Sequence, residues 1–254
     1  MSEELRIDVA DGVMTVRFNR PEKKNALTHA MYGGVADALA EADRRDDVRV
    51  VLLCGTEDCF TAGNDLNDFL NNPPRGEDRP AARFLEGLTR LQKPMVAAVN
   101  GVAVGVGTTM LLHCDMVYAG EGARLQLPFV NLALVPEAAS SMLLPEMAGH
   151  HRAAELLMLG EPFDAAQALA LGIVNDVFPD GEVQQRAREV ALKLAAKPPE
   201  ALRLTKALIK RGRGEAARER MQVESEHFSA QLKSAEAREA MQAIMEKRKP
   251  DFAK

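Results

Sequence analysis

The chain has 254 residues, of which 46% are hydrophobic, 27% are charged and 4% are aromatic, and it contains no tryptophan. These values are typical of a soluble globular protein with one large domain, or with one domain and an appendage. The net charge of −5 and the scarcity of aromatic rings argue against nucleic-acid binding, which needs a basic surface and stacking platforms.

The N-terminal part predicts a hairpin, a helix and a buried strand. Residues 4–9 and 13–19 alternate apolar and polar side chains, and Asp11-Gly12 suits the tight turn between them. Residues 27–46 predict a helix with Thr28 as its N-cap. The run VRVVLLCG predicts a buried strand, and NNPPRGEDRP predicts a solvated loop with several helix breakers.

The middle of the chain alternates strands and helices. MVAAVNG predicts a buried strand, GTTMLLHCD a short helix, and MVYAG and ARLQL two further strands. The rhythm of strand, turn, strand and helix predicts an α/β fold of stacked repeats, not a plain doubly wound sheet. The long uncharged run that begins at Pro94 contains Asn100, His113, glycines and threonines, so we expect no membrane segment there.

The C-terminal part predicts mainly amphipathic helices. FDAAQALALG ends at Gly172, a suitable residue after a helix end, and IVNDVF predicts a short strand. Three helices should follow, the last of them one long helix over residues 215–248. The KPP break at 197–199 suggests a core of residues 1–197 and a helical region of residues 198–254, which would cover the core or contact another subunit.

Cysteine usage and the chain ends favour a cytoplasmic protein. Cys54, Cys59 and Cys114 form no CxxC motif, so we expect reduced packing residues. The start MSEELRIDVADG lacks the basic and apolar segments of a signal peptide, and the closing DFAK is not a peroxisomal address. No cluster of residues has metal-site spacing, so no metal is expected.

Two glycine-containing turns could offer backbone N–H groups to an anion. CFTAGNDLNDF and NGVAVGVGTT each follow a buried strand and lead into a helical pattern. The second lacks the glycine spacing of a dinucleotide fold and the lysine of a P-loop. Each turn could be an ordinary loop, or the two together could form an oxyanion site. Asp65 and Asp68 are expected to be solvated residues of a first helical turn.

Glu137 is the only charged residue between Arg124 and Glu146. On local grounds it favours a helix start, where its charge suits the helix dipole. The alternative is a buried carboxylate whose pKa is raised by its apolar surroundings. The local sequence alone leaves both interpretations open.

Several motifs together resemble the crotonase (enoyl-CoA hydratase/isomerase) superfamily, over nearly the whole chain. They are NRPEKKNAL, FTAGNDL, VNGVAVGVG, CDMVYAG, LVPEAASS, LALGIVNDV and EKRKPDF. The resemblance implies an α/β, crotonase-like spiral of ββα repeats with a helical C-terminal region. It also implies a homotrimer or hexamer and an acyl-CoA thioester substrate, with coenzyme A as part of the substrate and no permanently bound cofactor.

The resemblance also implies roles for individual residues. Backbone N–H groups of Asn64 and Val106 would form an oxyanion hole, although the family usually has glycine at the second position. The positions expected to contact substrate or coenzyme A are Lys24, Ala26, Ala62, Gly63, Asp65, Leu66 and Gly105, with Arg20 and Lys23 as further cations near the phosphates. Phe129, Leu132 and Met142 would line the acyl pocket.

The acids of the family distinguish its subgroups. Typical hydratases carry glutamates where this chain has Thr109 and Phe129, whereas AGNDLNDF and LVPEAASS look like peroxisomal-type delta-3,delta-2-enoyl-CoA isomerases. In these, one glutamate at the position of Glu137 transfers the proton. The resemblance therefore implies a 3-enoyl-CoA to 2-enoyl-CoA isomerase with Glu137 as acid/base. Another crotonase activity, such as hydration or thioester hydrolysis, and a non-catalytic acyl-CoA-binding protein are the alternatives.

Overall fold

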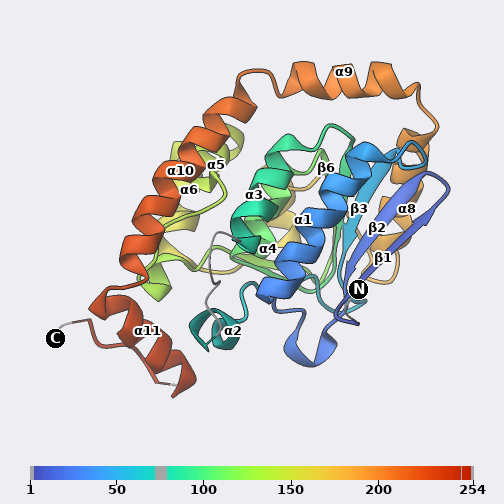
Figure 1. Ribbon diagram of the computed structural model, residues 1–254. Coiled ribbons are helices and arrows are strands. Elements are labelled where there is room, and N and C mark those ends of the chain that lie inside the picture. Colours follow the sequence, from blue (N-terminus) through green and yellow to red (C-terminus); the bar gives the residue numbers. More distant parts are fainter. Residues whose placement is uncertain (1–2, 72–78, 247, 253–254) are drawn as a thin grey trace.

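A computed structural model of the chain describes residues 3–71, 79–246 and 248–252 (Figure 1). The middle of the expected solvated loop, residues 72–78, lies outside the described residues. Among the residues described, no helix combines the length and the apolar character that crossing a membrane requires.

A six-stranded sheet organises the core, with strand order β1-β2-β3-β4-β6-β9. β1 pairs antiparallel with β2, and the other neighbouring strands pair in parallel. Its strands are β1 (Leu5–Ala10), β2 (Val13–Phe18), β3 (Val50–Cys54), β4 (Met95–Val99), β6 (Met116–Gly120) and β9 (Asp176–Phe178). A smaller sheet has the order β5-β7-β8 and comprises β5 (Val102–Val104), β7 (Arg124–Gln126) and β8 (Phe163–Asp164). The α/β spiral of the expected class is confirmed.

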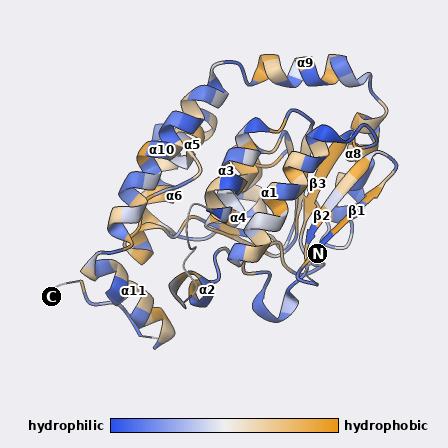
Figure 2. Ribbon diagram, viewed as in Figure 1, coloured by the Kyte–Doolittle hydropathy of each residue, from blue (hydrophilic) through white to orange (hydrophobic). Residues whose placement is uncertain are grey.

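Helices cover both faces of the large sheet. α8 (Val183–Ala195) packs on β3, β4 and β6 through alanines of its buried face, and α1 (His29–Arg44) packs with α3 (Pro80–Arg90) on the other face. The remaining core helices are α2 (Leu66–Asn71), α4 (Val106–Thr109), α5 (Ser140–Ala148), α6 (His150–Leu159) and α7 (Ala165–Ala170), with short 3-10 turns η1 (Pro21–Lys23), η2 (Met110–His113) and η3 (Val130–Leu132). Figure 2 shows that β2 and β3 are largely hydrophobic, as strands buried on both faces must be.

Local sequence signals explain several element ends. Asp11 and Gly12 both have positive φ, as the tight hairpin turn between β1 and β2 requires. Thr28 caps α1 by accepting a hydrogen bond from Met31 N–H. Gly172 follows α7 with a φ of 73°, in the left-handed region. These predictions are confirmed.

The C-terminal helices are α9 (Pro199–Ile209), α10 (Arg213–Gln231) and α11 (Ala235–Met245). α9 crosses from the α8 side of the molecule to α10, which lies along α5, as Figure 1 shows. Lys206 of α9 is buried and places its Nζ 2.7 Å from Asp115 Oδ2 and 2.6 Å from the carbonyl of Lys93. This ion pair fixes α9 to the core.

The expectation of one long helix over residues 215–248 is wrong. α10 ends at Gln231, and Ser234 begins α11 by accepting a hydrogen bond from Ala237 N–H. A serine side chain satisfies an unpaired amide at a helix start, so it favours a new helix over continuation. The two helices can then take different directions around the core.

The three cysteines form no disulfide. Burial raises the pKa of Cys54 and of Cys59 to about 11, and that of Cys114 to about 12. The expectation of reduced packing residues is confirmed, because such thiols stay protonated and unreactive near neutral pH.

Candidate active site

Two glycine turns lie side by side at the joint between the sheets. Thr61 N–H donates to the carbonyl of Val102, and Val104 N–H donates to the carbonyl of Thr61. Gly63 has a φ of 87°, and a Cβ there would come within 2.7 Å of the Val104 carbonyl oxygen. Only glycine permits this close approach. The first turn (residues 61–64) and the second turn (residues 104–107) are therefore held in contact by their backbones.

Each turn contains at least one N–H group that has no acceptor among the described residues. Among the residues the structure describes, the N–H groups of Asn64 and Val106 donate to no other group, whereas those of Ala62, Gly63 and Gly105 are used within the protein. Val106 begins α4, where the first amides of a helix have no intrahelical acceptor. Two unpaired donors on adjacent turns can hold an oxyanion.

Glu137 lies beside the second turn. Thr109 Oγ1, one helical turn after Val106, donates a hydrogen bond of 2.5 Å to Glu137 Oε1. α5 begins only at Ser140, so the carboxylate is not a cap of that helix. The helix-start interpretation of Glu137 is therefore incorrect, and the carboxylate is directed towards Thr109, the last residue of α4.

Burial changes the acidity of this carboxylate. Glu137 retains some surface exposure as a residue, but its carboxyl group is enclosed by protein, and desolvation raises its pKa to about 7. The Thr109 hydrogen bond opposes this increase, and the charge of Glu224 adds to it. A carboxylate with this pKa can both accept and return a proton near neutral pH.

Tyr32 links Glu137 to the first turn. Its hydroxyl donates a short hydrogen bond to Asn64 Oδ1, and burial, with a smaller contribution from the charge of Glu137, raises the pKa of Tyr32 well above its usual value. The phenol therefore stays protonated and fixes the Asn64 side chain. The carboxylate and both free amides belong to one region of the molecule.

The three side chains expected to line the acyl pocket are apolar and belong to the core region. Phe129 is buried in the core, and Leu132 and Met142 are partly buried against it. Val106 is only 4% exposed, so its side chain packs into the core. The side chain of this valine, which stands where the resemblance expects glycine, therefore does not project into solvent.

The positions expected to contact coenzyme A lie around the first turn. Ala62 N–H donates to the carbonyl of Lys24, which connects this turn to the exposed loop of Lys23 and Lys24. Ala26 accepts a hydrogen bond from Arg20 through its carbonyl, and Leu66 begins α2. Hydrogen bonds therefore connect the first turn to this loop, and α2 follows directly in the chain.

Arg20 and Asp65 differ from their expected environments. Arg20 Nη1 lies 2.6 Å from Asp65 Oδ2, and the two side chains are only 13% and 11% exposed. Asp65 also accepts from Asp68 N–H. Asp65 is not the solvated residue that its place in the sequence indicated, and Arg20 is occupied by an ion pair that neutralises both buried charges.

The sequence interpretation missed two residues that hold the Glu137 segment. His113 Nε2 donates a hydrogen bond of 2.7 Å to the carbonyl of Ala138. Burial lowers the pKa of His113 to about 4, so the ring is neutral. Glu224 of α10 is 5% exposed and accepts from Ala139 N–H at 2.6 Å. The sequence does indicate that Glu224 is buried, because Glu224 lies on the same face of its helix as Ala217, Met221 and Phe228.

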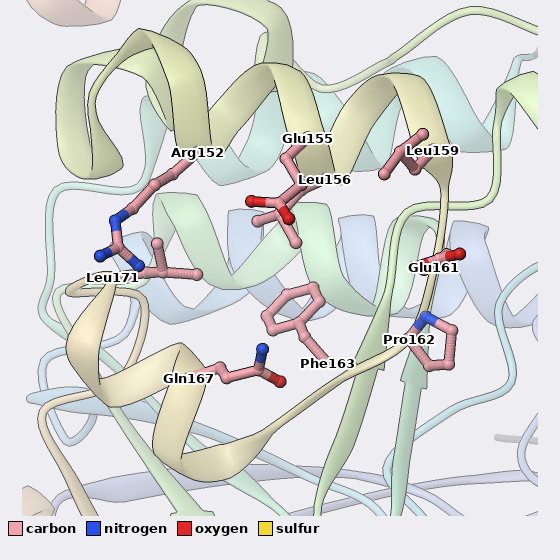
Figure 3. Close-up of a pocket in the computed structure, with 9 residues that line it drawn as sticks. All are labelled: Arg152, Glu155, Leu156, Leu159, Glu161, Pro162, Phe163, Gln167 and Leu171. Carbon is pink, nitrogen blue, oxygen red and sulfur yellow. The ribbon is translucent and has the colours of Figure 1, made fainter.

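A surface cavity between α6 and α7 lies apart from this site (Figure 3). Figure 3 shows Glu155, Phe163 and Gln167 converging on it. Gln167 Oε1 already accepts from Asp164 N–H in the capping box of α7. The residues that line the cavity include neither the two turns nor Glu137.

Comparisons with known proteins agree with this geometry. The family model described as "Enoyl-CoA hydratase/isomerase" matches residues 8–254. A 1,2-epoxyphenylacetyl-CoA isomerase of Escherichia coli is 35% identical over 260 residues, with 99% of each chain covered. Human enoyl-CoA delta isomerase 2 is 36% identical over 82% of this chain and 55% of its own length. A 2,3-dehydroadipyl-CoA hydratase of Escherichia coli is 31% identical over 98% of each chain.

Solved structures show the same fold. An enoyl-CoA hydratase/isomerase of Pseudoalteromonas atlantica superposes with a TM-score of 0.95 at 42% identity, covering 98% of this chain and 99% of its own. The chain belongs to the enoyl-CoA hydratase/isomerase family of the crotonase superfamily. It is thus an acyl-CoA enzyme, as the resemblance implied.

Proposed function

We propose that this enzyme moves the double bond of 3-enoyl-CoA thioesters to give 2-enoyl-CoA. The single observation that carries the proposal is the position of Glu137, a desolvated carboxylate with a pKa near 7 beside two adjacent turns with free amides. Double-bond migration needs one base that returns the proton it removes, and it needs no activated water.

The proton transfer would involve two carbons of the acyl chain. The Glu137 carboxylate removes a proton from Cα, and the electrons of that C–H bond form a dienolate whose negative charge lies largely on the thioester oxygen. The protonated Glu137 then delivers the proton to Cγ, and the C=C bond moves into conjugation with the carbonyl. Substrate and product have the same composition, so no other reactant is required.

The two free amides would stabilise the intermediate. The N–H groups of Asn64 and Val106 would bind the thioester oxygen as it gains charge, and each such donor contributes roughly 10²–10³ in rate. α4 is only one helical turn, so the direct hydrogen bond from Val106 N–H is expected to outweigh the helix dipole. The apolar side chains of Phe129, Leu132 and Met142 would accommodate the acyl chain.

Coenzyme A would bind along the first turn and its neighbouring loop. Lys23 and Lys24 are exposed there and can approach phosphates, whereas Arg20 is already paired with Asp65. The backbone of Lys24, Ala26 and Ala62 would contact the nucleotide part, and Gly63, Leu66 and Gly105 would shape the path of the thioester. Asp65 would act by holding Arg20 and the start of α2.

The experiment that tests the activity compares substrates. We expect turnover of a 3-enoyl-CoA ester, followed by the absorbance of the conjugated product, with little hydration of crotonyl-CoA. Thr109 and Phe129 offer no second carboxylate to activate water, which explains the preference. Predominant hydration would indicate the hydratase alternative, and binding without turnover of either ester would indicate an acyl-CoA-binding protein.

A homotrimer or hexamer is proposed as the working assembly. Apolar side chains remain exposed on α9, where Leu204, Leu208 and Ile209 are 47%, 68% and 74% exposed. Such a cluster on one helix is typical of a surface that another subunit covers. Residues 198–254 would then both cover the core and contact a second copy.

A further inference from the structure

α5 starts without a capping side chain from its own sequence. Its N-cap residue is Ala139, and among the described residues of its first turn no side chain accepts from the free amides. Ala138 and Ala139 both have a φ of 58°, a left-handed conformation that an alanine adopts only under constraint. Some other part of the protein must stabilise this backbone.

Glu224 supplies the missing acceptor from a distant helix. Its two carboxylate oxygens accept from Ala139 N–H at 2.6 Å, from Ser141 N–H at 3.1 Å and from Ser141 Oγ at 2.5 Å. The side chain is nearly fully buried, so these bonds replace the water that a charged group would otherwise need. The carboxylate thus caps α5 from α10.

The capped segment continues directly into Glu137. Ser140 donates to the Glu137 carbonyl through both its N–H, at 3.0 Å, and its Oγ, at 2.7 Å. His113 holds the intervening carbonyl of Ala138 through a hydrogen bond from Nε2. A change at Glu224 would therefore be transmitted through two residues to the backbone of Glu137.

We propose that Glu224 is a positioning residue for Glu137: by capping α5 from α10, it fixes the left-handed turn that directs the Glu137 carboxylate towards the oxyanion turns. This inference rests on the proposed role of Glu137 as acid/base. It gives the C-terminal helical region a part in proton transfer in addition to its covering role. Glu224 itself makes its bonds to the protein and would not contact the substrate.

Charge adds a second effect that packing alone would not produce. The groups facing Glu137 are Thr109 on α4, Tyr32 on α1 and, through the turn, Glu224, while His113 is neutral. Arg220 of α10 faces Glu224 and remains in every variant considered below. Removing the Glu224 charge should lower the pKa of Glu137, because two nearby carboxylates disfavour each other's ionisation.

The test compares Glu224→Gln with Glu226→Gln, an exposed position on the same helix. Glu224→Gln keeps the side-chain size but replaces one carboxylate oxygen by an NH₂ group. That group cannot accept a hydrogen bond from Ala139 or Ser141. We expect kcat for a 3-enoyl-CoA ester to fall about 10²-fold, as small displacements of a catalytic group can cause, with KM little changed. Glu224→Asp should recover part of the activity, and Glu226→Gln should behave as wild type.

Two measurements without turnover separate this proposal from the proposed function. NMR titration of the Glu137 carboxyl carbon, assigned through Glu137→Gln, should give a lower pKa in Glu224→Gln than in Glu226→Gln. Hydrogen exchange of the Ala139 and Ser141 amides should be faster in Glu224→Gln. If the folded Glu224→Gln protein keeps the wild-type Glu137 pKa and slow amide exchange, the positioning role is wrong. If those values change while wild type fails to isomerise 3-enoyl-CoA, the function is wrong and the positioning role stands.

Discussion

Thr109 Oγ1 donates a hydrogen bond to Glu137 Oε1 and joins the end of α4 to the segment before α5. The bond favours the ionised carboxylate, because a donor stabilises the charged form, while burial favours the neutral form. The pKa of about 7 reflects the balance of these effects together with the Glu224 charge. Four predictions follow from the site around this pair and from the C-terminal helices.

Thr109→Val should move the acid limb of the kcat/KM profile to higher pH. The substitution keeps the side-chain shape and removes the donor, so less Glu137 is ionised at neutral pH. We expect kcat/KM at pH 7 to fall about tenfold, in line with the loss of one hydrogen bond to a charged group. Thr205→Val on the exposed face of α9 is the control and should leave the profile unchanged. A profile identical to wild type in Thr109→Val would contradict this account.

Glu137→Gln should stabilise the protein at high pH. The pKa of Glu137 is raised from 4.5 to about 7 in the folded state. The neutral carboxyl group therefore contributes its full stabilisation of the folded state below pH 4.5, and this contribution is lost as the pH rises through 7. The glutamine variant has no such loss and should gain up to roughly 3 kcal/mol at pH 8. Thermal denaturation at pH 4.5 and pH 8 checks this, with a difference expected only at pH 8. Equal stability of both proteins at pH 8 would show that the carboxyl group is well solvated.

Gly63→Ala should reduce activity through the backbone of the first turn. The added Cβ would come within 2.7 Å of the Val104 carbonyl oxygen, at a φ of 87° that disfavours alanine. We expect a loss of roughly 1–3 kcal/mol in stability from the strained backbone. Displacement of Asn64 N–H should also reduce kcat about 10²-fold. Gly181→Ala, with open space around the new Cβ, is the matched control in denaturation and rate measurements.

The exposed face of α9 should mediate assembly. Light scattering coupled to size exclusion should give a mass about three or six times the 27.7 kDa of one chain, as the proposed trimer or hexamer requires. Replacing Leu208 and Ile209 by aspartate should shift the mass towards a single chain, because buried charges destabilise an interface. If the wild-type protein has the mass of a single chain, the proposed trimer or hexamer is wrong.

Much of the fold follows from short-range signals in the sequence. The Asp11-Gly12 turn, the Thr28 cap and the end of α7 at Gly172 depend on residues close together in the chain, so the sequence predicts them. The break between α10 and α11 was also available, because Ser234 is a good N-cap residue. It was missed because the apolar pattern continues across the break.

The missing parts of the site depend on contacts between distant residues. Glu137 and the two glycine turns were identified through motifs, but nothing near Glu224 indicates that it accepts from Ala139, 85 residues earlier. Similarly, Asp65 was expected to be solvated and Arg20 to lie near phosphates, whereas the fold places their charged groups 2.6 Å apart. A charged residue on the apolar face of a helix, such as Glu224, indicates from the sequence that a buried polar contact exists, but it does not identify the partner.

The most direct test of the account measures isomerisation of a 3-enoyl-CoA ester by wild type and by Glu137→Gln, with acyl-CoA binding measured in parallel. The variant should bind a saturated acyl-CoA with unchanged affinity, because both oxyanion turns are intact. Its kcat should fall by at least about 10²–10⁴, the contribution of a positioned general base. Turnover by Glu137→Gln at a rate close to wild type would contradict the account.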